Sequence, residues 1–214
     1  MTRIVSIEGN IGSGKSTLVE RLRDTLPSEE YHFLEEPVDA WESITDEQNV
    51  SVLARFYEDQ HKYAFSFQMM AYISRLALLK DAMAAHPTKV IVTERSVMTD
   101  KHVFAKMMHD EDKIGTIDYK IYLRWFDYFL REIPETKMVY VNTSPKVCHE
   151  RVRSRNRGGE QQIPLEYLET CNAYHEDWLG DASALLVVDG DTARDAEFDP
   201  VDSWCETVKL WLVV

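Results

Sequence analysis

The sequence is poor in basic residues and in long apolar runs. Its 214 residues include 24 Lys and Arg against 37 Asp and Glu, which gives a formal net charge of −13 at pH 7. A chain this acidic does not attract polymeric nucleic acid through its overall field, although a local basic patch can still bind a small anion. No apolar run approaches the roughly 20 residues that a membrane-spanning helix needs. We therefore expect neither a nucleic-acid partner nor a membrane partner.

Cysteine is also scarce, since Cys148, Cys171 and Cys205 are the only three and form no CxxC pair. The seven histidines include no HExxH sequence, so a zinc site is not expected. Isolated thiols suit a reducing compartment, where they are usually buried or inert. We recognise no signal or transit peptide ahead of the segment "TRIVSIEG". These features predict a cytoplasmic protein.

Apolar runs alternate with helical patterns along the chain. We expect strands at residues 3–9, 31–37, 89–96, 137–144 and 184–191, and helices at 16–26, 50–86, 145–157, 164–179 and 200–212, with mixed helical patterns over 100–133. This alternation predicts an α/β fold, a doubly wound five-stranded parallel sheet flanked by helices. Because no repeat, low-complexity tract or linker interrupts it, we expect residues 1–214 to form a single domain.

The segment "SIEGNIGSGKST" contains the pattern G-x-x-x-x-G-K-[ST] between an apolar strand and an amphipathic helix. This context is what distinguishes a phosphate-binding loop from a chance match. The helix N-terminus favours a bound anion, Lys15 would reach the β- and γ-phosphates of ATP, and Ser16 would hold Mg²⁺. The pattern therefore predicts a P-loop NTPase-type fold. Its expected ATP-binding residues are Gly9, Asn10, Ile11, Gly12, Ser13, Gly14, Lys15, Ser16 and Thr17.

A phosphate-binding loop alone does not separate kinases from motors, switches and repair ATPases. Further segments follow it in order: "EEPVDAW", "FSFQMMAYISR", "TERSVMTDKHVF" and "RVRSRNRGGEQQIPLEYL". With the loop they resemble the deoxyribonucleoside kinase family over about residues 4–178, and within it the branch that accepts deoxycytidine and the purine deoxynucleosides. The resemblance implies that ATP, with Mg²⁺ as cofactor, phosphorylates the 5′-hydroxyl of a deoxynucleoside for nucleotide salvage, in a homodimer.

The resemblance places catalytic residues at the carboxyl edge of the sheet, where such folds bind ligands. It makes Glu36, directly before Pro37, the general base for the 5′-hydroxyl, although the sequence alone would also fit a solvated acid at a strand end. It assigns Arg95 to the substrate hydroxyl and the transferring phosphate, and Glu94 to the magnesium shell with Ser16. A structural ion pair between Glu94 and Arg95 is the alternative. The expected catalytic residues are thus Glu36, Arg95 and Lys15.

Base recognition is expected on the long helix. Gln68 and Arg75 are seven residues apart and share one face, and the Gln68 amide offers a donor and an acceptor to a base edge. In a closed pocket Arg75 would pair with Asp100, because either charge alone is costly to bury. That pair would occupy the space of a thymine methyl, unless it is purely structural. The substrate-binding residues that the resemblance implies are Glu36, Trp41, Tyr57, Phe67, Gln68, Arg75, Arg95, Asp100, Phe104 and Glu160.

A basic run, "RVRSRNR", stands out in the acidic chain and could be a solvated surface. It resembles the lid of the family, about residues 151–163, in which Arg151, Arg155 and Arg157 would close over the ATP phosphates. Gly158 and Gly159 would let the lid move. Glu160 would contact the sugar 3′-hydroxyl together with Tyr57. Family members often carry two acids in the lid, and here glycine replaces the first of them.

Two other functions remain open from the sequence. A nucleoside monophosphate kinase of the same fold would need extra cations for the acceptor phosphate, and a P-loop ATPase switch would not need the Gln and Phe residues of the long helix. The HRD and DFG segments of protein kinases are absent. Turnover with nucleosides, nucleotides and oligonucleotides as acceptors would separate these possibilities.

Overall fold

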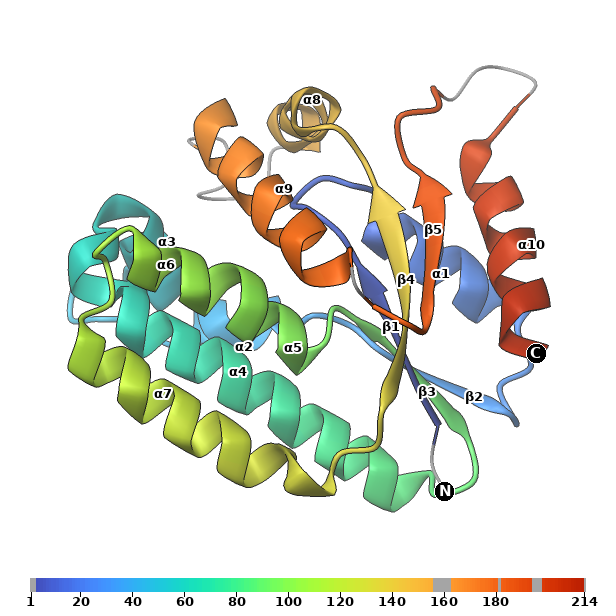
Figure 1. Ribbon diagram of the computed structural model, residues 1–214, viewed down its shortest axis with the longest axis horizontal. Helices are drawn as coiled ribbons and strands as arrows, with labels where there is room; N and C mark the ends of the chain where they lie inside the picture. Colours follow the sequence, from blue (N-terminus) through green and yellow to red (C-terminus); the bar gives the residue numbers. More distant parts are fainter. Residues whose placement is uncertain (1–2, 156–162, 181, 194–197, 214) are drawn as a thin grey trace.

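A computed structural model describes residues 3–155, 163–180, 182–193 and 198–213. Five parallel strands form one sheet in the order β2-β3-β1-β4-β5, as the sequence predicts (Figure 1). The strands are β1 (Arg3–Glu8), β2 (Tyr31–Leu34), β3 (Val90–Glu94), β4 (Thr136–Asn142) and β5 (Leu185–Asp189). Strands β2 and β3 lie on one side of β1, and β4 and β5 lie on the other side. The carboxyl ends beside β1 therefore form the topological switch point, where ligands bind in such sheets.

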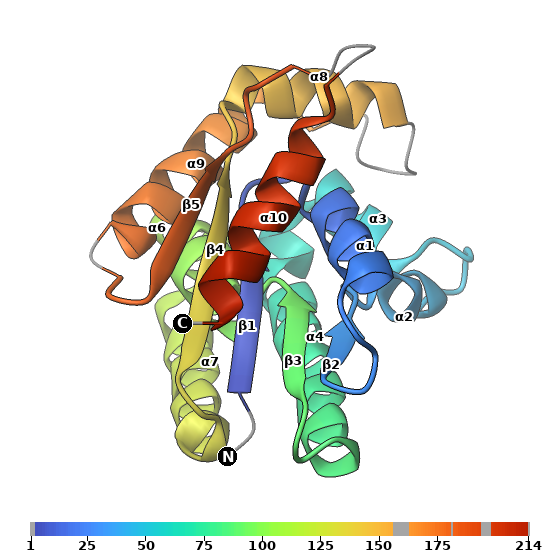
Figure 2. The ribbon, with the colours of Figure 1, turned by 90° about the vertical axis from the view of Figure 1, so that its right-hand side faces the viewer.

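Helices cover both faces of the sheet (Figures 1 and 2). Because side chains alternate along a strand, Val5 and Ile7 of β1 pack with α1 (Lys15–Thr25) and α10 (Pro200–Val213), while Ile4 packs with α4 (Gln60–Ala85). On the α4 side, α7 (Thr116–Phe129) packs along α4, and α9 (Leu165–Leu179) lies near β4. None of the described helices is both long enough and apolar enough to cross a membrane.

The expected single helix over 50–86 is wrong, because the structure breaks it into α3 (Val52–Glu58) and α4. Asp59 leaves the helical region, with φ −145° and ψ 87°, and its side chain accepts a hydrogen bond from the Lys62 N–H at 3.1 Å. An aspartate that caps the next helix in this way competes with continued helical bonding. The break turns α3 so that it lies beside the long α4.

Several elements lie where the sequence indicated only mixed helix. Residues 97–132 form α5 (Val97–Thr99), a π-helical turn η1 (Asp100–Ala105), α6 (Lys106–Asp110), α7 and a 3₁₀ turn η2 (Leu130–Glu132). Two others are α2 (Val38–Ser43) and α8 (Pro145–Arg155). Figure 2 shows α8 lying across the carboxyl edge of the sheet. Strand β2 ends at Leu34, so Glu36 follows the strand rather than ending it.

Candidate active site

The loop between β1 and α1 has the backbone of a phosphate cradle. Gly9, Gly12 and Gly14 have φ angles of +146°, +81° and +107°, a region that residues with a Cβ seldom adopt. A Cβ on Gly12 would lie 2.6 Å from the Cys148 carbonyl oxygen, and one on Gly9 would lie 2.8 Å from the Val141 carbonyl oxygen. The glycines therefore let the loop press against β4 and α8.

Lys15 and Ser16 follow the last glycine of this loop and line one cavity. The Lys15 side chain is buried, and its Nζ donates to the Asn10 carbonyl oxygen at 2.6 Å. Burial, with the nearby Arg95 guanidinium, lowers the pKa of Lys15 to about 7. The Ser16 hydroxyl donates to Glu94 Oε1 at 2.8 Å, so a hydroxyl and a carboxylate lie together beside the cradle. Such oxygen ligands suit Mg²⁺, which usually takes few protein ligands and shares the phosphates of a nucleotide.

A cavity of about 440 Å³ extends from this loop over the carboxyl edge of the sheet. It brings together most of the predicted site, namely Ile11, Gly12, Gly14, Lys15, Ser16, Thr17, Glu36, Trp41, Tyr57, Phe67, Gln68, Arg75, Glu94, Arg95, Asp100, Phe104 and Arg151. Of the other loop residues, Asn10 faces away, since its Nδ2 donates to the Leu168 carbonyl oxygen at 2.8 Å. Ser13 is buried and accepts through its carbonyl oxygen from the Thr143 hydroxyl at 2.9 Å. Asn10 and Ser13 thus connect the loop to α9 and to the segment that follows β4.

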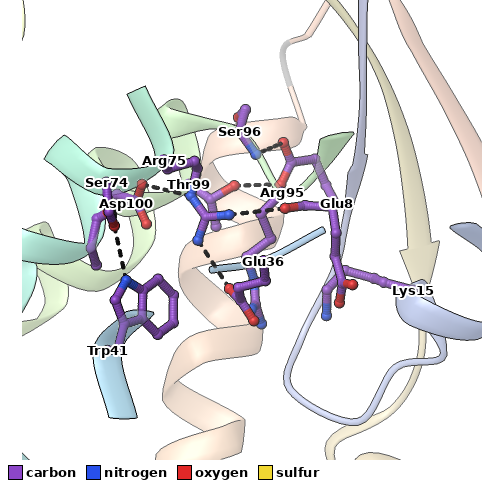
Figure 3. A network of polar contacts seen from close by, with 12 residues as sticks. Glu8, Lys15, Glu36, Trp41, Ser74, Arg75, Arg95, Ser96, Thr99 and Asp100 are labelled. Atoms are coloured by element: carbon purple, nitrogen blue, oxygen red, sulfur yellow. Dashed lines mark hydrogen bonds and ion pairs between the residues drawn. The ribbon is translucent and has the colours of Figure 1, made fainter. Parts of the chain in front are cut away.

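Glu36 lines the cavity and binds two arginines (Figure 3). Its Oε1 accepts from Arg95 Nη1 at 2.7 Å and from Arg75 Nη2 at 2.9 Å. Burial alone would raise the pKa of Glu36, but Arg95, Arg75 and Lys15 together hold it well below its usual range. The carboxylate is therefore ionised at neutral pH. Glu94 and Arg95 do not pair with each other among the described residues.

Arg75 donates hydrogen bonds to three residues of the site. Its Nε donates to Asp100 Oδ2 at 3.0 Å and its Nη1 to the Glu94 carbonyl oxygen at 2.9 Å, in addition to the bond to Glu36. Burial opposes the charge of Arg75, yet Asp100 and Glu36 raise its pKa. Burial raises the pKa of Asp100 to about 6 against the pull of Arg75. The sequence predicted the contact with Asp100 but not the link from Arg75 to Glu36.

The far end of the cavity is aromatic. Phe67 stacks on Phe56 with ring centroids 4.6 Å apart, and Trp41 and Phe67 form a T-shaped pair with ring centroids 5.5 Å apart. The Trp41 indole N–H donates to the Ser74 hydroxyl at 2.9 Å, which fixes the ring. Gln68 is only 2% exposed, lines the cavity and makes no side-chain hydrogen bond in the described part of the chain. Its amide donor and acceptor are thus available to a ligand in the cavity.

Only residues 151–155 and 163 of the predicted lid lie among the described residues. Arg151, on α8, donates to the carbonyl oxygens of Ser13 at 3.1 Å and Gly190 at 2.9 Å, so its guanidinium braces the phosphate loop. Arg153 is exposed, whereas Arg155 ends the helix with a side chain that is not described. Arg157, Gly158, Gly159 and Glu160 lie outside the described residues, so their predicted roles stay predictions.

The sequence argument missed several cavity residues. They are Val38, Leu53, Phe56, Ala71, Ser154 and Tyr167. Leu53 and Phe56 are three residues apart on α3, so they share a helix face, and that spacing could have indicated them. Tyr167 comes from α9, more than 110 residues further along the chain than Phe56. Nothing in its local sequence indicates that it meets α3 and the phosphate loop.

Known proteins resemble this chain over most of its length. The family model described as deoxynucleoside kinase matches residues 5–208. The chain is similar to deoxycytidine kinase of Mus musculus, at 35% identity over 200 residues, covering 83% of this chain and 76% of the mouse protein. It is 32% identical to deoxycytidine kinase of Homo sapiens over 200 residues (83% and 76%). It is 30% identical to the human mitochondrial thymidine kinase 2 over 196 residues (88% and 71%).

Proposed function

The chain belongs to the deoxynucleoside kinase family and is therefore an ATP-dependent kinase of deoxynucleosides, and we propose that it prefers deoxycytidine or a purine deoxynucleoside to thymidine. The observation that carries this preference is the buried pair of Arg75 and Asp100 in the wall of the cavity, which Gln68 also lines. We also propose that residues 1–214 form a single domain. The protein would act in nucleotide salvage, in the cytoplasm.

In this proposal the phosphate loop and Lys15 hold the ATP phosphates, and Glu36 receives the 5′-hydroxyl. Glu36 is ionised and can accept the hydroxyl proton, while Arg95, 2.7 Å from it, neutralises charge on the transferring phosphate. A carboxylate with so low a pKa is a weak base. That suffices because phosphoryl transfer has a loose transition state, in which the base chiefly orients the hydroxyl and takes its proton late.

Magnesium is the cofactor that the site fits. Ser16 Oγ and Glu94 Oε1, 2.8 Å apart, are oxygen ligands at the edge of the phosphate loop. A bound Mg²⁺ would neutralise charge on the β- and γ-phosphates of ATP. Without it, Glu94 still accepts the Ser16 hydroxyl and so holds the first turn of α1 toward the end of β3.

A nucleoside monophosphate kinase is the less favoured alternative. Such an enzyme needs cations that are free to bind the phosphate of its acceptor. In the described acceptor part of the cavity, Arg75 and Arg95 already bind the carboxylates of Glu36 and Asp100. A neutral sugar hydroxyl leaves these pairs intact. Turnover with deoxycytidine against deoxycytidine monophosphate as acceptor tests this choice directly.

The base preference predicts a change of ranking on mutation. We expect the double variant Arg75→Met with Asp100→Ala to move the ratio of kcat/KM for deoxycytidine over thymidine toward thymidine by about tenfold or more, because room is freed for the thymine methyl and a fixed donor and acceptor are lost. All absolute rates should also fall, since Arg75 holds Glu36. The measurement is kcat/KM for the four deoxynucleosides.

The matched control is Lys101→Met with Asp127→Ala, which removes an ion pair of 3.2 Å from η1 and α7 outside the cavity. It should leave the ranking unchanged. A wild type that prefers thymidine would contradict the proposal, and so would a double variant at positions 75 and 100 whose ranking matches that of the wild type.

The protein is also proposed to form a homodimer through α4 and α7. These helices lie side by side in Figure 1 and carry large exposed apolar side chains, namely Ile73 and Leu78 on α4 and Ile117, Ile121, Trp125 and Tyr128 on α7. On α7 these residues follow one another at helical spacing and form one apolar stripe. A second copy can cover such a stripe with its own through a two-fold axis.

We expect Ile117→Glu with Ile121→Glu to convert the dimer to a monomer, because charge in an apolar interface is costly to desolvate. Sedimentation equilibrium measures the mass. The control is Leu210→Glu, a residue 72% exposed on α10 at the other face of the sheet. A monomeric wild type, or a dimer that survives the double change, would refute the proposed interface.

A further inference from the structure

Glu8, the last residue of β1, is fully buried and has no part in the chemistry described above. Its two carboxyl oxygens bind one turn of the chain (Figure 3). Oε1 accepts from the Ser96 backbone N–H at 3.0 Å, and Oε2 accepts from the Thr99 hydroxyl. Glu8 thus joins the strand that leads into the phosphate loop to the turn that follows β3.

That turn has a backbone that needs support. Arg95 has φ +59°, in the left-handed region that residues other than glycine adopt at a cost and only when the surroundings enforce it. Its own N–H donates to the Ile7 carbonyl oxygen at 3.0 Å, and the next N–H, of Ser96, donates to Glu8. Consecutive amides of the turn are therefore held by consecutive residues of β1.

The two ends of the turn carry the charged groups of the site. Arg95 begins it and donates to Glu36, while Asp100 directly follows Thr99 and accepts from Arg75. Ser96 is the N-cap of α5, but its side chain makes no capping bond, and Glu8 accepts the Ser96 N–H instead. One buried carboxyl thus binds next to Arg95 at one end and next to Asp100 at the other.

We propose that Glu8 is a positioning residue of the nucleoside site: it fixes the turn between β3 and α5 so that Arg95 reaches Glu36 and Asp100 reaches Arg75. This inference rests on the proposed roles of Arg95 and Asp100. Without the Glu8 side chain, the Ser96 N–H and the Thr99 hydroxyl lose their buried acceptor, and the strained backbone at Arg95 loses a restraint. The displacement of Arg95 and Asp100 should lower kcat/KM for the nucleoside and leave KM for ATP close to that of wild type.

The test compares Glu8→Ala, Glu8→Gln and Thr99→Val with the wild type, in steady-state kinetics with each substrate varied. Glu8→Ala should lower kcat/KM for deoxycytidine by about tenfold or more and narrow its lead over thymidine. Glu8→Gln should recover most of this loss, since its amide oxygen can accept the Ser96 N–H and its amide nitrogen can donate to Thr99. Glutamine also restores the volume of the side chain, so the separation from a purely volumetric effect comes from Thr99→Val, which removes the hydroxyl donor to Glu8 and keeps the shape of the side chain.

Thr99→Val probes the same contact from the turn, away from the phosphate loop. It should repeat the nucleoside defect in milder form, with KM for ATP within about twofold of wild type, and adding it to Glu8→Ala should change little. It also decides the matter if Glu8→Ala does not fold. Ser6→Ala is the matched control, since Ser6 is fully buried on β1 and its hydroxyl has no partner in the described residues. It should leave all constants unchanged.

Arg95→Met separates this inference from the function it rests on. If Arg95→Met lowers turnover while Glu8→Ala and Thr99→Val do not, the role of Glu8 is refuted and the site stands. A defect of Glu8→Ala and Thr99→Val that falls on KM for ATP alone also refutes it. If Arg95→Met itself leaves turnover unchanged, the proposed function of the site fails.

Discussion

Replacing Glu36 with glutamine is expected to lower kcat by about 100-fold or more, while ATP and the deoxynucleoside still bind. The amide keeps the size of the side chain and an oxygen that can accept from Arg95, but it cannot take the proton of the 5′-hydroxyl. It also removes the negative charge that Arg75 and Arg95 share. Steady-state kinetics measures kcat, and calorimetry measures binding of each substrate.

The neighbouring Glu35 offers the control for this prediction. Glu35 is exposed and pairs with Arg23 at 2.6 Å, outside the active-site cavity. Glu35→Gln therefore changes the net charge of the protein by the same amount as Glu36→Gln, at the adjacent position. Its kcat should stay close to that of wild type. If Glu36→Gln retains kcat within about twofold of wild type, Glu36 does not act as the base.

The sheet could be predicted because its determinants are local. The run "KVIVTERS" is continuous and apolar, which is typical of a strand buried on both faces, and every residue of β3 is buried. The phosphate loop could be predicted because glycine spacing dictates backbone shape. Gly9, Gly12 and Gly14 have the positive φ angles that this loop requires. In both cases neighbouring residues alone decide the conformation.

The parts that were missed depend on contacts between distant segments. The break at Asp59 required a weighing of one capping bond against continued helix, which periodicity does not resolve. The bond from Arg75 to Glu36 joins α4 to the segment after β2, and the two bonds of Glu8 join β1 to the turn after β3. The sequence could indicate which residues are polar near a sheet edge. It could not indicate which of them share an arginine.

Replacing Lys15 with alanine is expected to abolish phosphoryl transfer and to leave the fold intact. The phosphates would lose the cation that the loop supplies, and that charge is most needed when the γ-phosphate is in transit. Lys15 is buried and donates only to the Asn10 carbonyl oxygen at 2.6 Å among the described residues, so its removal disturbs little else. The measurements are turnover and a thermal unfolding curve.

The lowered pKa of Lys15 adds a second readout on the wild type. Above its pKa of about 7 the free side chain is mostly neutral, whereas bound phosphates favour the charged form and raise that pKa. Binding of ATP at pH 8 should therefore take up a proton, seen as a buffer-dependent calorimetric heat, and ATP affinity should fall as the pH rises above about 7.

The control for Lys15→Ala is Lys89→Ala, because Lys89 also donates to a backbone carbonyl, of Ser28 at 2.8 Å, but on an exposed surface. Near-normal turnover of Lys15→Ala with a normal unfolding curve would remove the phosphate loop from the mechanism, and a heat independent of buffer would show that Lys15 already carries its proton before ATP arrives.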